Sequence, residues 1–244
     1  MKTFKVISML LILSLAVLTS VSQARSQKYM AKQISLKIDG NLGEWNGANI
    51  IKFDQLKDVG ANIPDPKDFS GTGMIGWNPT DPNRIYFAAD ITDDINQDIH
   101  PAGDLWWEDD SLEIMFDFDN NAILVQWTID ANGKEISAAA TVDNLKWIVV
   151  KKANGYIYEG AIDPSKDNPA LPGVGKNFKA EVGKIIGLAF HFNECENGTR
   201  EHQIGWTPGG AWDANAYGDL IFDAAKAPVD IYGKLVTTWA NLKR

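Results

Sequence analysis

The 244-residue chain has one cysteine and three histidines, and these scarcities exclude several kinds of site. Cys195 has no partner in the chain, so no internal disulfide forms and stability must come from packing. The histidines are too far apart in the sequence to form a local metal-binding motif; they are His100, His191 and His202. The sequence also lacks a His-Glu-x-x-His zinc helix, a nucleophile elbow and a glycine-rich phosphate loop.

Long apolar runs are confined to the start of the chain. Residues 1–24 combine Lys2 and Lys5 with an apolar run over 6–18 and a small-x-small site that ends at Ala24. This pattern is typical of a signal peptide, so we expect cleavage near Ala24 and a secreted or periplasmic protein of bacterial type. The run is too short for a comfortable membrane span, and no later stretch approaches one. No membrane-spanning segment is therefore predicted.

Positive charge is also scarce. The chain has 23 Lys and Arg against 32 Asp and Glu, a formal net charge of −9, and removal of the two lysines of the signal takes it to −11. An acidic exported protein is a poor partner for nucleic acid or anionic lipid, so neither is expected. The roughly 220 residues that remain suffice for one all-β domain with a full core, and no linker divides them.

What the chain does contain is a series of short segments in which apolar and polar residues alternate. In residues 111–118, Leu112, Ile114 and Phe116 point one way while Glu113 and Met115 point the other, the signature of a half-buried strand. Further strands are predicted at 34–38, 73–77, 85–91, 123–130, 145–152, 156–162, 186–193 and 219–223, with a long loop over 53–72. Many short strands with Gly and Pro turns predict an all-β fold, a jelly-roll-like antiparallel β-sandwich.

Two adjacent tryptophans precede the strand at 111–118. Trp106 and Trp107 are followed directly by an acidic run, residues 108–110, which we expect to be too polar for the core. At least one indole should then stand at a wet loop near Glu113. An aromatic plate beside a hydrogen-bonding carboxylate suits a sugar, whose C–H faces stack on rings while its hydroxyls seek charged acceptors.

The polar faces of the predicted strands indicate a floor for such a site. If neighbouring strands pair antiparallel, these faces line one side of a sheet and present Glu113, Gln126, Thr128, His191 and Asn193. Each of these side chains also has a purely structural interpretation, as a group bonded to nearby backbone or packed within the sheet. Tryptophan is usually mostly buried, so most of the nine should be core residues.

Four stretches resemble family 9 carbohydrate-binding modules, and together they span about 34–223 in the order of that family. They are Ile38-Asp-Gly-Asn-Leu-Gly-Glu-Trp45, Trp107-Glu-Asp-Asp-Ser-Leu-Glu113, Gly155-Tyr-Ile-Tyr-Glu-Gly-Ala-Ile162, and Trp212 with Tyr217-Gly-Asp-Leu220. The order makes the set more specific than any single motif. Residues 224–244 lie outside the resemblance and form a C-terminal tail of unknown role.

The resemblance implies a site for a terminal sugar. The family clasps the sugar between two tryptophans over a polar sheet face, and Trp107 and Trp212 match these aromatics while Glu113 matches a hydroxyl-binding carboxylate. By position, His191 replaces a glutamine of the family. The predicted ligand-binding set is Trp107, Glu113, Thr128, His191, Asn193 and Trp212.

Two positions depart from the family pattern. Thr128 falls where the family has an arginine, and Gly209 where it has an asparagine. Threonine cannot supply the fork of donors that arginine offers. The identity of the sugar therefore stays open.

The resemblance also implies that a structural calcium ion is possible, although no cofactor is required for sugar binding. Hard cations take several oxygen ligands from flexible acidic loops, and the candidates here are Glu44, Asp90, Asp93 and Asp94. The alternative for Asp90, Asp93 and Asp94 is a solvated acidic loop. In the turn after Asp39-Gly40, we expect Trp45 to pack against the sandwich edge while Glu44 holds backbone donors or a cation.

Three functions remain open from the sequence. The reading we favour is a non-catalytic module, alone or as a subunit, that binds an oligosaccharide or polysaccharide. A glycoside hydrolase needs only two suitably spaced carboxylates, which this acidic chain could supply. A haem domain of related sandwich shape would use Met74, Met115 or His191 as ligands, although no Cys-x-x-Cys-His motif is present.

Overall fold

The computed structural model describes residues 25, 27–100, 105–134, 143–166 and 171–227. The predicted signal peptide at 1–24 and most of the predicted tail lie outside the described residues. Twelve strands and three short 3₁₀ turns make up the regular structure of the described part. The turns are η1 (Leu42–Trp45), η2 (Trp106–Glu108) and η3 (Ala214–Ala216). The strands are β1 (Lys28–Gln33), β2 (Ile51–Phe53), β3 (Gln55–Leu56), β4 (Phe69–Asn78), β5 (Asp81–Asp93), β6 (Ser111–Asp117), β7 (Val125–Asp130), β8 (Leu145–Lys152), β9 (Gly155–Ile162), β10 (Ile185–Glu196), β11 (Thr199–Gly205) and β12 (Gly218–Lys226).

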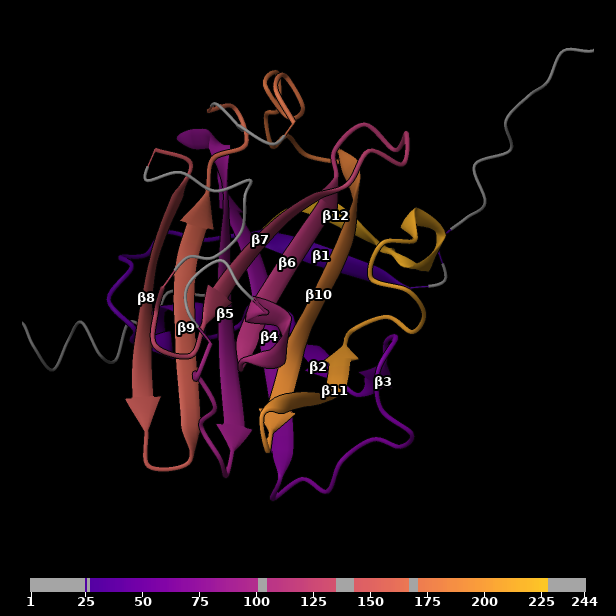
Figure 1. Ribbon diagram of the computed structural model, residues 1–244. Coiled ribbons are helices and arrows are strands. Elements are labelled where there is room, and N and C mark those ends of the chain that lie inside the picture. Colours follow the sequence, from indigo (N-terminus) through magenta and orange to yellow (C-terminus); the bar gives the residue numbers. More distant parts are fainter. Residues whose placement is uncertain (1–24, 26, 101–104, 135–142, 167–170, 228–244) are drawn as a thin grey trace, which may run out of the picture.

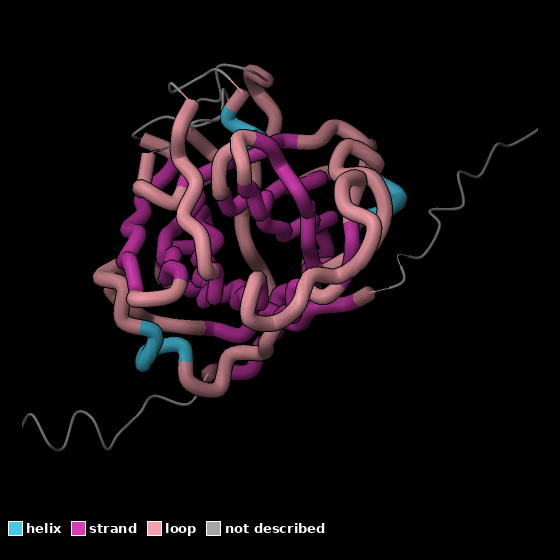
Figure 2. The backbone as a smooth tube through the Cα atoms, turned by 60° about the horizontal axis from the view of Figure 1, so that its bottom comes forward, coloured by secondary structure: helices cyan, strands magenta, loops and turns pink. Residues whose placement is uncertain are grey.

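The strands form two layers (Figures 1 and 2). One layer has the order β8-β9-β5-β4, with β2 beside β4, and the other has β7-β6-β10-β11-β3. Strands β12 and β1 connect β10 to β4. β1 runs parallel to both of its neighbours and the other pairs are antiparallel. The prediction of an antiparallel β-sandwich is thus confirmed, with one parallel strand that the sequence did not indicate.

The core lies between the layers because the apolar face of each strand turns inward. Phe192 on β10 is completely buried and contacts rings from the opposite layer. Its ring centroid lies 5.3 Å from that of Phe69 on β4 and 6.2 Å from that of Tyr158 on β9. Full burial of one such apolar side chain contributes about 1.5–3 kcal/mol. The apolar half of the alternation in β6 and β10 therefore holds the layers together.

The strands that differ from the sequence prediction are β1, β2, β3 and β11, and the long loop predicted over 53–72 contains β3 and the start of β4. The first strand is β1, at residues 28–33, so the strand predicted at 34–38 is wrong. In β1 only Tyr29 and Ala31 point inward, which is too short an apolar alternation to recognise among lysines and glutamines. Strand β11 was not predicted at all, because Ile204 is its only aliphatic residue. It pairs with β10 on one side and with β3 on the other.

The opening motif packs against the outer face of β9. Trp45 is 2% exposed, and its Nε1 donates to Oε1 of Glu159 over 2.8 Å. The other oxygen of Glu159 accepts the backbone N–H groups of Asp39 and Gly40, at 2.8 and 2.7 Å. Glu44 accepts the backbone N–H of Lys37 over 2.7 Å. The expected contact of Glu44 with a backbone donor is confirmed, whereas Trp45 packs on the outer face of the sheet rather than at its edge. Glu159 is the residue that binds the turn to the sheet.

One end of the core is acidic. Asp110 is completely buried, so the expectation that residues 108–110 are too polar for the core is wrong. Its carboxylate is accommodated because it accepts the backbone N–H groups of Gln97 and Cys195, at 2.8 and 2.9 Å. Asp93 on β5 is 4% exposed and faces the same region. Burial and then the charge of Glu194 raise the pKa of Asp93 to about 7, and burial and then Asp93 raise the pKa of Asp110 to about 9.

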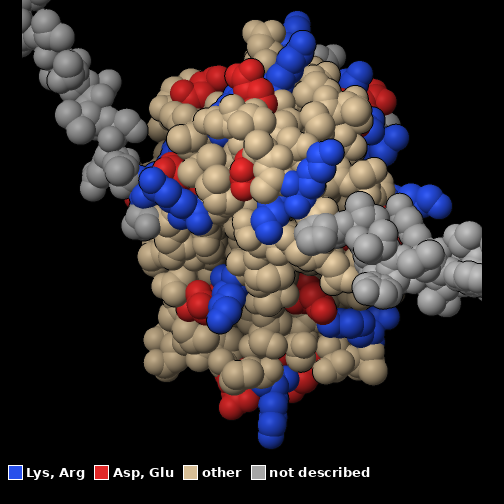
Figure 3. Space-filling view, turned by 180° about the vertical axis from the view of Figure 1, so that it is seen from behind, with Lys and Arg blue, Asp and Glu red and all other residues tan. Residues whose placement is uncertain are grey.

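Charges elsewhere on the surface are mixed. On the face that Figure 3 shows, Lys and Arg are interspersed with Asp and Glu, and neither sign gathers into a patch among the described residues. Within the described ranges, no helix is long and apolar enough to cross a membrane.

Replacement of Glu159 tests the anchor of the opening turn. In the wild type the carboxylate of Glu159 accepts these N–H groups. In Glu159→Gln an amide N–H₂ faces the same donors, so we expect a loss of about 2–4 kcal/mol in the free energy of unfolding. Urea denaturation measures this loss, with an unchanged m-value. The exposed Glu181→Gln serves as the control, and equal stability of the two variants would contradict the assignment.

The acidic end of the core predicts a pH dependence of stability. Because the pKa of Asp93 is raised from 3.8 to about 7, the folded state holds a proton that the unfolded state loses, and stability falls as pH rises from about 4 to about 7. Asp93→Asn removes this titration and should reduce the loss of unfolding free energy between pH 5 and pH 8. Asp119→Asn, at an exposed aspartate away from this end of the core, should leave the loss as in wild type. The same decline in all three proteins would refute the prediction.

Candidate functional site

Two exposed tryptophans and several polar side chains line one pocket of about 220 Å³. Trp107, in η2, is 39% exposed, and Trp212, in the loop after β11, is 63% exposed. Both lie where the sequence led us to expect them, on loops beside the polar sheet face. The complete lining consists of Asp58, Trp107, Glu113, Gln126, Arg200, Gln203, Ala211 and Trp212.

The floor of the pocket is the outer face of β7, β6, β10 and β11. Glu113 on β6 lies opposite Thr128 on one side and His191 on the other. Asn193, two residues further along β10, lies opposite Gln203 of β11. The antiparallel register therefore brings the predicted polar residues together on one face of the sheet.

Glu113 is a buried charge beneath this pocket. It is 2% exposed, its Oε1 accepts Nδ2 of Asn193 over 2.6 Å, and its Oε2 pairs with Nε2 of His191. Burial opposes ionisation of Glu113, but the contacts with His191 and then Asn193 bring its pKa below the ordinary value. Burial lowers the pKa of His191, although Glu113 partly offsets this. The carboxylate of Glu113 is therefore stabilised by two partners on β10, His191 and Asn193.

The other predicted residues lie beneath the lining of the pocket. Thr128, His191 and Asn193 are completely buried, and none belongs to the lining. The Oδ1 atom of Asn193 accepts Nη1 of Arg200 over 3.0 Å and Nε2 of Gln203 over 3.1 Å. Asn193 thus joins Glu113 to two lining side chains. Thr128 has a buried Oγ1 without a hydrogen-bond partner.

The loop that carries Trp212 is held at Ala211, the residue that precedes the indole. The backbone N–H of Ala211 donates to Oδ2 of Asp58 over 3.1 Å. The hydroxyl of Tyr217 donates to the carbonyl of Ala211 over 3.0 Å. Tyr217 and Ala211 also pack on Met115, so the side chains of the outer sheet face support this loop. Trp212 is therefore exposed on a fixed backbone.

The segment that carries Trp107 is fixed by acidic side chains. Besides the two bonds of Asp110, Oδ1 of Asp109 accepts the backbone N–H of Ile99 over 2.9 Å. The side chain of Gln97 donates to the carbonyl of Glu108 over 2.8 Å. The acidic run thus organises the loop that presents Trp107, although the sequence analysis assigned it to the wet surface.

Three lining residues with polar side chains were missed by the sequence analysis. Arg200 and Gln203 come from β11, the strand that had no recognisable alternation, and Asp58 follows the short strand β3. No family motif covers them. The signal that could have found Arg200 is its position just after the Asn197-Gly198 turn, where a hairpin partner of β10 must begin.

The candidate calcium ligands do not gather in one place. Glu44 bonds to the backbone of Lys37, Asp90 pairs with Lys152, and Asp93 faces the core while Asp94 is exposed. Structural calcium stays a prediction.

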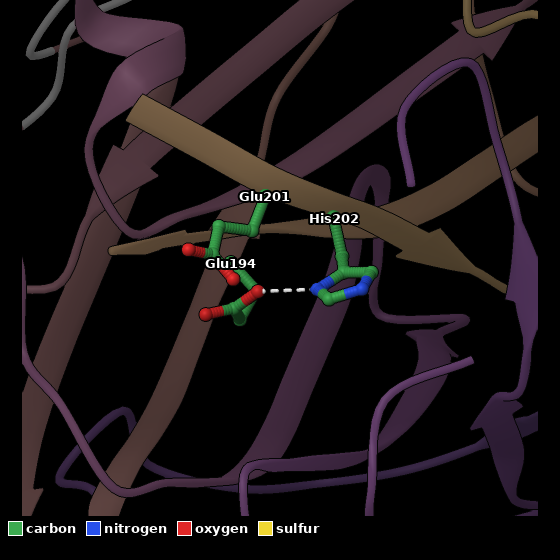
Figure 4. Close-up of side chains that lie close together, drawn as sticks. All are labelled: Glu194, Glu201 and His202. Atoms are coloured by element: carbon green, nitrogen blue, oxygen red, sulfur yellow. Dashed lines mark hydrogen bonds and ion pairs between the residues drawn. The ribbon is translucent and has the colours of Figure 1, made fainter. Parts of the chain in front are cut away.

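In the described part of the chain, possible metal ligands converge instead on β10 and β11, in two groups that share Glu194. One is Glu194, Glu201 and His202, whose side chains approach one another in Figure 4. Nδ1 of His202 already pairs with Oε2 of Glu194 over 2.7 Å, so two members of this group bond to each other. The second group is Asp68, Glu194 and Glu196.

Comparisons with solved structures support the fold. A family 9 carbohydrate-binding module from Caldicellulosiruptor kristjanssonii in complex with cellotriose is 19% identical, with a TM-score of 0.65, over 84% of this chain and 99% of that chain. A family 9 module from the same organism in complex with glucose is 17% identical, with a TM-score of 0.64, over 84% of this chain and 100% of that chain. A putative carbohydrate-binding protein from Bacteroides uniformis is 12% identical, with a TM-score of 0.56, over 81% and 99%. At these identities the likeness concerns the fold alone.

The family follows from a comparison of sequence models. No curated protein matches the chain. The model described as carbohydrate family 9 binding domain-like matches residues 38–224, which include both exposed tryptophans and all four motifs of the sequence analysis. The chain therefore belongs to the carbohydrate family 9 binding domain-like family.

Proposed function

We propose that this protein is an exported, non-catalytic module that binds the terminal sugar of an oligosaccharide or polysaccharide between Trp107 and Trp212. The observation that carries the proposal is that both indoles are exposed and line the same pocket, with Glu113 in its lining. Large exposed aromatics that share a pocket are typical of a binding surface.

The chemistry of the pocket suits a sugar. A pyranose presents C–H groups on its faces, which stack on indole rings, and hydroxyls around its edge, which bond to polar side chains. Arg200, Gln126 and Gln203 line the pocket beside Glu113 and supply both donors and acceptors. The loops behind Trp107 and Trp212 are tied by hydrogen bonds that are buried or partly buried, so little ordering is required on binding.

The relatives of similar fold suggest which sugar to test first. The two family 9 modules from Caldicellulosiruptor kristjanssonii are complexes with cellotriose and with glucose. We extend this to the present chain as a proposal and choose glucose and cellotriose as probes. The two tryptophans correspond in chain order to the aromatic clamp that the resemblance implies.

A glycoside hydrolase is the second candidate, because two carboxylates, Asp58 and Glu113, line the pocket. Their surroundings argue against catalysis. The pKa of Glu113 lies below its ordinary value, since His191 and Asn193 outweigh burial, whereas a general acid needs a raised pKa. Asp58 accepts the N–H of Ala211 and so supports the loop of Trp212.

The haem alternative receives no support from the geometry. Met74 and Met115 lie in separate apolar clusters, and Nε2 of His191 pairs with Glu113. The three proposed ligands therefore do not converge.

Removal of either tryptophan should weaken sugar binding. Trp107→Ala and Trp212→Ala each lose one stacking face, which we expect to weaken cellotriose binding about tenfold or more. Isothermal titration calorimetry with cellotriose and glucose measures the affinity. Val182→Ala, which truncates an apolar side chain that is 60% exposed outside the pocket, should bind as wild type does. Wild-type affinity in both tryptophan variants would show that the site is elsewhere.

Glu113→Gln separates binding from catalysis. The charge-assisted bonds of Glu113 should weaken, and we expect cellotriose affinity to fall about tenfold, while wild type and variant alike release no chromophore from aryl glycosides. The readouts are calorimetry and a chromogenic glycoside panel. Turnover by the wild type that Glu113→Gln abolishes would favour the hydrolase.

A further inference from the structure

Strand β11 contains an irregularity that places two polar side chains on one face. Gln203 pairs with Asn193 and Arg200 pairs with Cys195, and the register shifts between Glu194 and Cys195. In a regular strand, residues three apart point to opposite faces, so Arg200 and Gln203 would be separated. The bulge inserts one extra residue, and as a result both side chains line the pocket of Trp107 and Trp212.

The positions that the family resemblance assigns to polar recognition are unable to supply it here. Thr128 is completely buried and lies outside the pocket lining. Gly209 has no side chain, and its φ of +85° disfavours any residue that carries a Cβ. The pocket therefore lacks both the arginine and the asparagine expected at these positions, and its one arginine in the lining is Arg200.

Asn193 holds Arg200 and Gln203 together. Its Oδ1 accepts Nη1 of Arg200 and Nε2 of Gln203, so one amide orients both side chains from behind. This uses one of the five N–H groups of the guanidinium. Oε1 of Gln203 is buried in a residue only 3% exposed and has no hydrogen-bond partner. The pocket thus combines a fork of donors with an acceptor that has no partner within the protein, and a hydroxyl group can satisfy this acceptor when the Gln203 side chain turns toward the pocket that it lines.

The charges near the pocket are of both signs, with a small excess of acids. The lining contains two acidic residues, Asp58 and Glu113, and one basic residue, Arg200. Lys57 is nearby, with Nζ donating to Oγ1 of Thr207 over 3.2 Å. Burial lowers the pKa of Lys57 to about 8, although the charges of Asp58 and Glu113 favour its ionised form. Asp213 adds a third acid near Lys57, so an uncharged ligand fits better than an anionic one such as a uronic acid.

We propose that Arg200 and Gln203 determine sugar specificity and replace the family's arginine and asparagine from a different strand. The guanidinium bonds two adjacent hydroxyls of an uncharged pyranose, and Gln203 accepts from one of them. The preferred ligand is thus a terminal sugar with a free, unmodified pair of neighbouring hydroxyls. This inference rests on the proposed sugar-binding function and adds the residues that read the hydroxyls.

Arg200→Lys tests the role of the fork, because it keeps the charge but loses the planar pair of donors. Calorimetry is carried out with cellotriose, glucose, 2-deoxyglucose, 3-deoxyglucose, 4-deoxyglucose and glucuronate. Wild type should bind glucose more tightly than glucuronate. Its affinity should fall about tenfold when either hydroxyl of one adjacent pair is removed from the sugar. Arg200→Lys should bind glucose about tenfold more weakly and should no longer distinguish those deoxy sugars from glucose.

Two further variants complete the test. Gln203→Met keeps the side-chain volume but removes the acceptor, and should abolish the penalty for one deoxy sugar of the pair. Arg84→Lys changes an arginine on β5, outside the pocket, and should retain the wild-type pattern. Thermal unfolding of each variant controls for loss of the fold.

The outcomes distinguish this inference from the proposed function. If Trp212→Ala loses cellotriose binding while Arg200→Lys keeps wild-type affinity and wild-type penalties, sugar binding stands and the role of Arg200 is overturned. If wild type binds none of the probes, both are overturned. If Arg200→Lys and Gln203→Met flatten the deoxy-sugar pattern in folded protein, the assignment is supported.

Discussion

The architecture of the pocket depends on a carboxylate that is buried in the outer face of a sheet. Glu113 is 2% exposed, and a buried charge without partners would be too costly to retain. His191 and Asn193 on the neighbouring strand satisfy it, and the antiparallel register of β6 and β10 aligns them. The polar stripe of these strands is thus a connected network, and its outermost members, Arg200 and Gln203, reach the ligand space.

The rim of the pocket also depends on polar side chains whose hydrogen bonds are satisfied within the protein. Asp110 and Asp109 accept backbone N–H groups and shape the loop of Trp107, whereas Asp58 and Tyr217 bond to Ala211 and shape the loop of Trp212. In these irregular segments the carboxylates accept backbone N–H groups that have no strand partner, and these hydrogen bonds offset the unfavourable burial of the carboxylates. The two indoles can therefore stay exposed without a flexible backbone beneath them.

Much of the fold was predictable because alternation is strong in the central strands, and β6 with Leu112 and Ile114 is the clearest case. Exposure of Trp107 was predicted from the neighbouring acidic run and from the family resemblance, and exposure of Trp212 from the resemblance alone. The rest was hidden for physical reasons. Strand β11 has one aliphatic residue and a bulge, so neither its existence nor the direction of Arg200 follows from a period. Burial of Asp110 depends on backbone donors from distant segments, which no local pattern reveals.

The central claim is that a sugar lies between Trp107 and Trp212, and the most direct measurement is an NMR titration of the indole N–H signals. The chain has nine tryptophans, so seven provide internal controls. Addition of cellotriose to the folded protein, with signals assigned by single substitutions, should shift the indole resonances of Trp107 and Trp212 most strongly. Saturating shifts confined to other tryptophans, or no shifts at any concentration, would contradict the account.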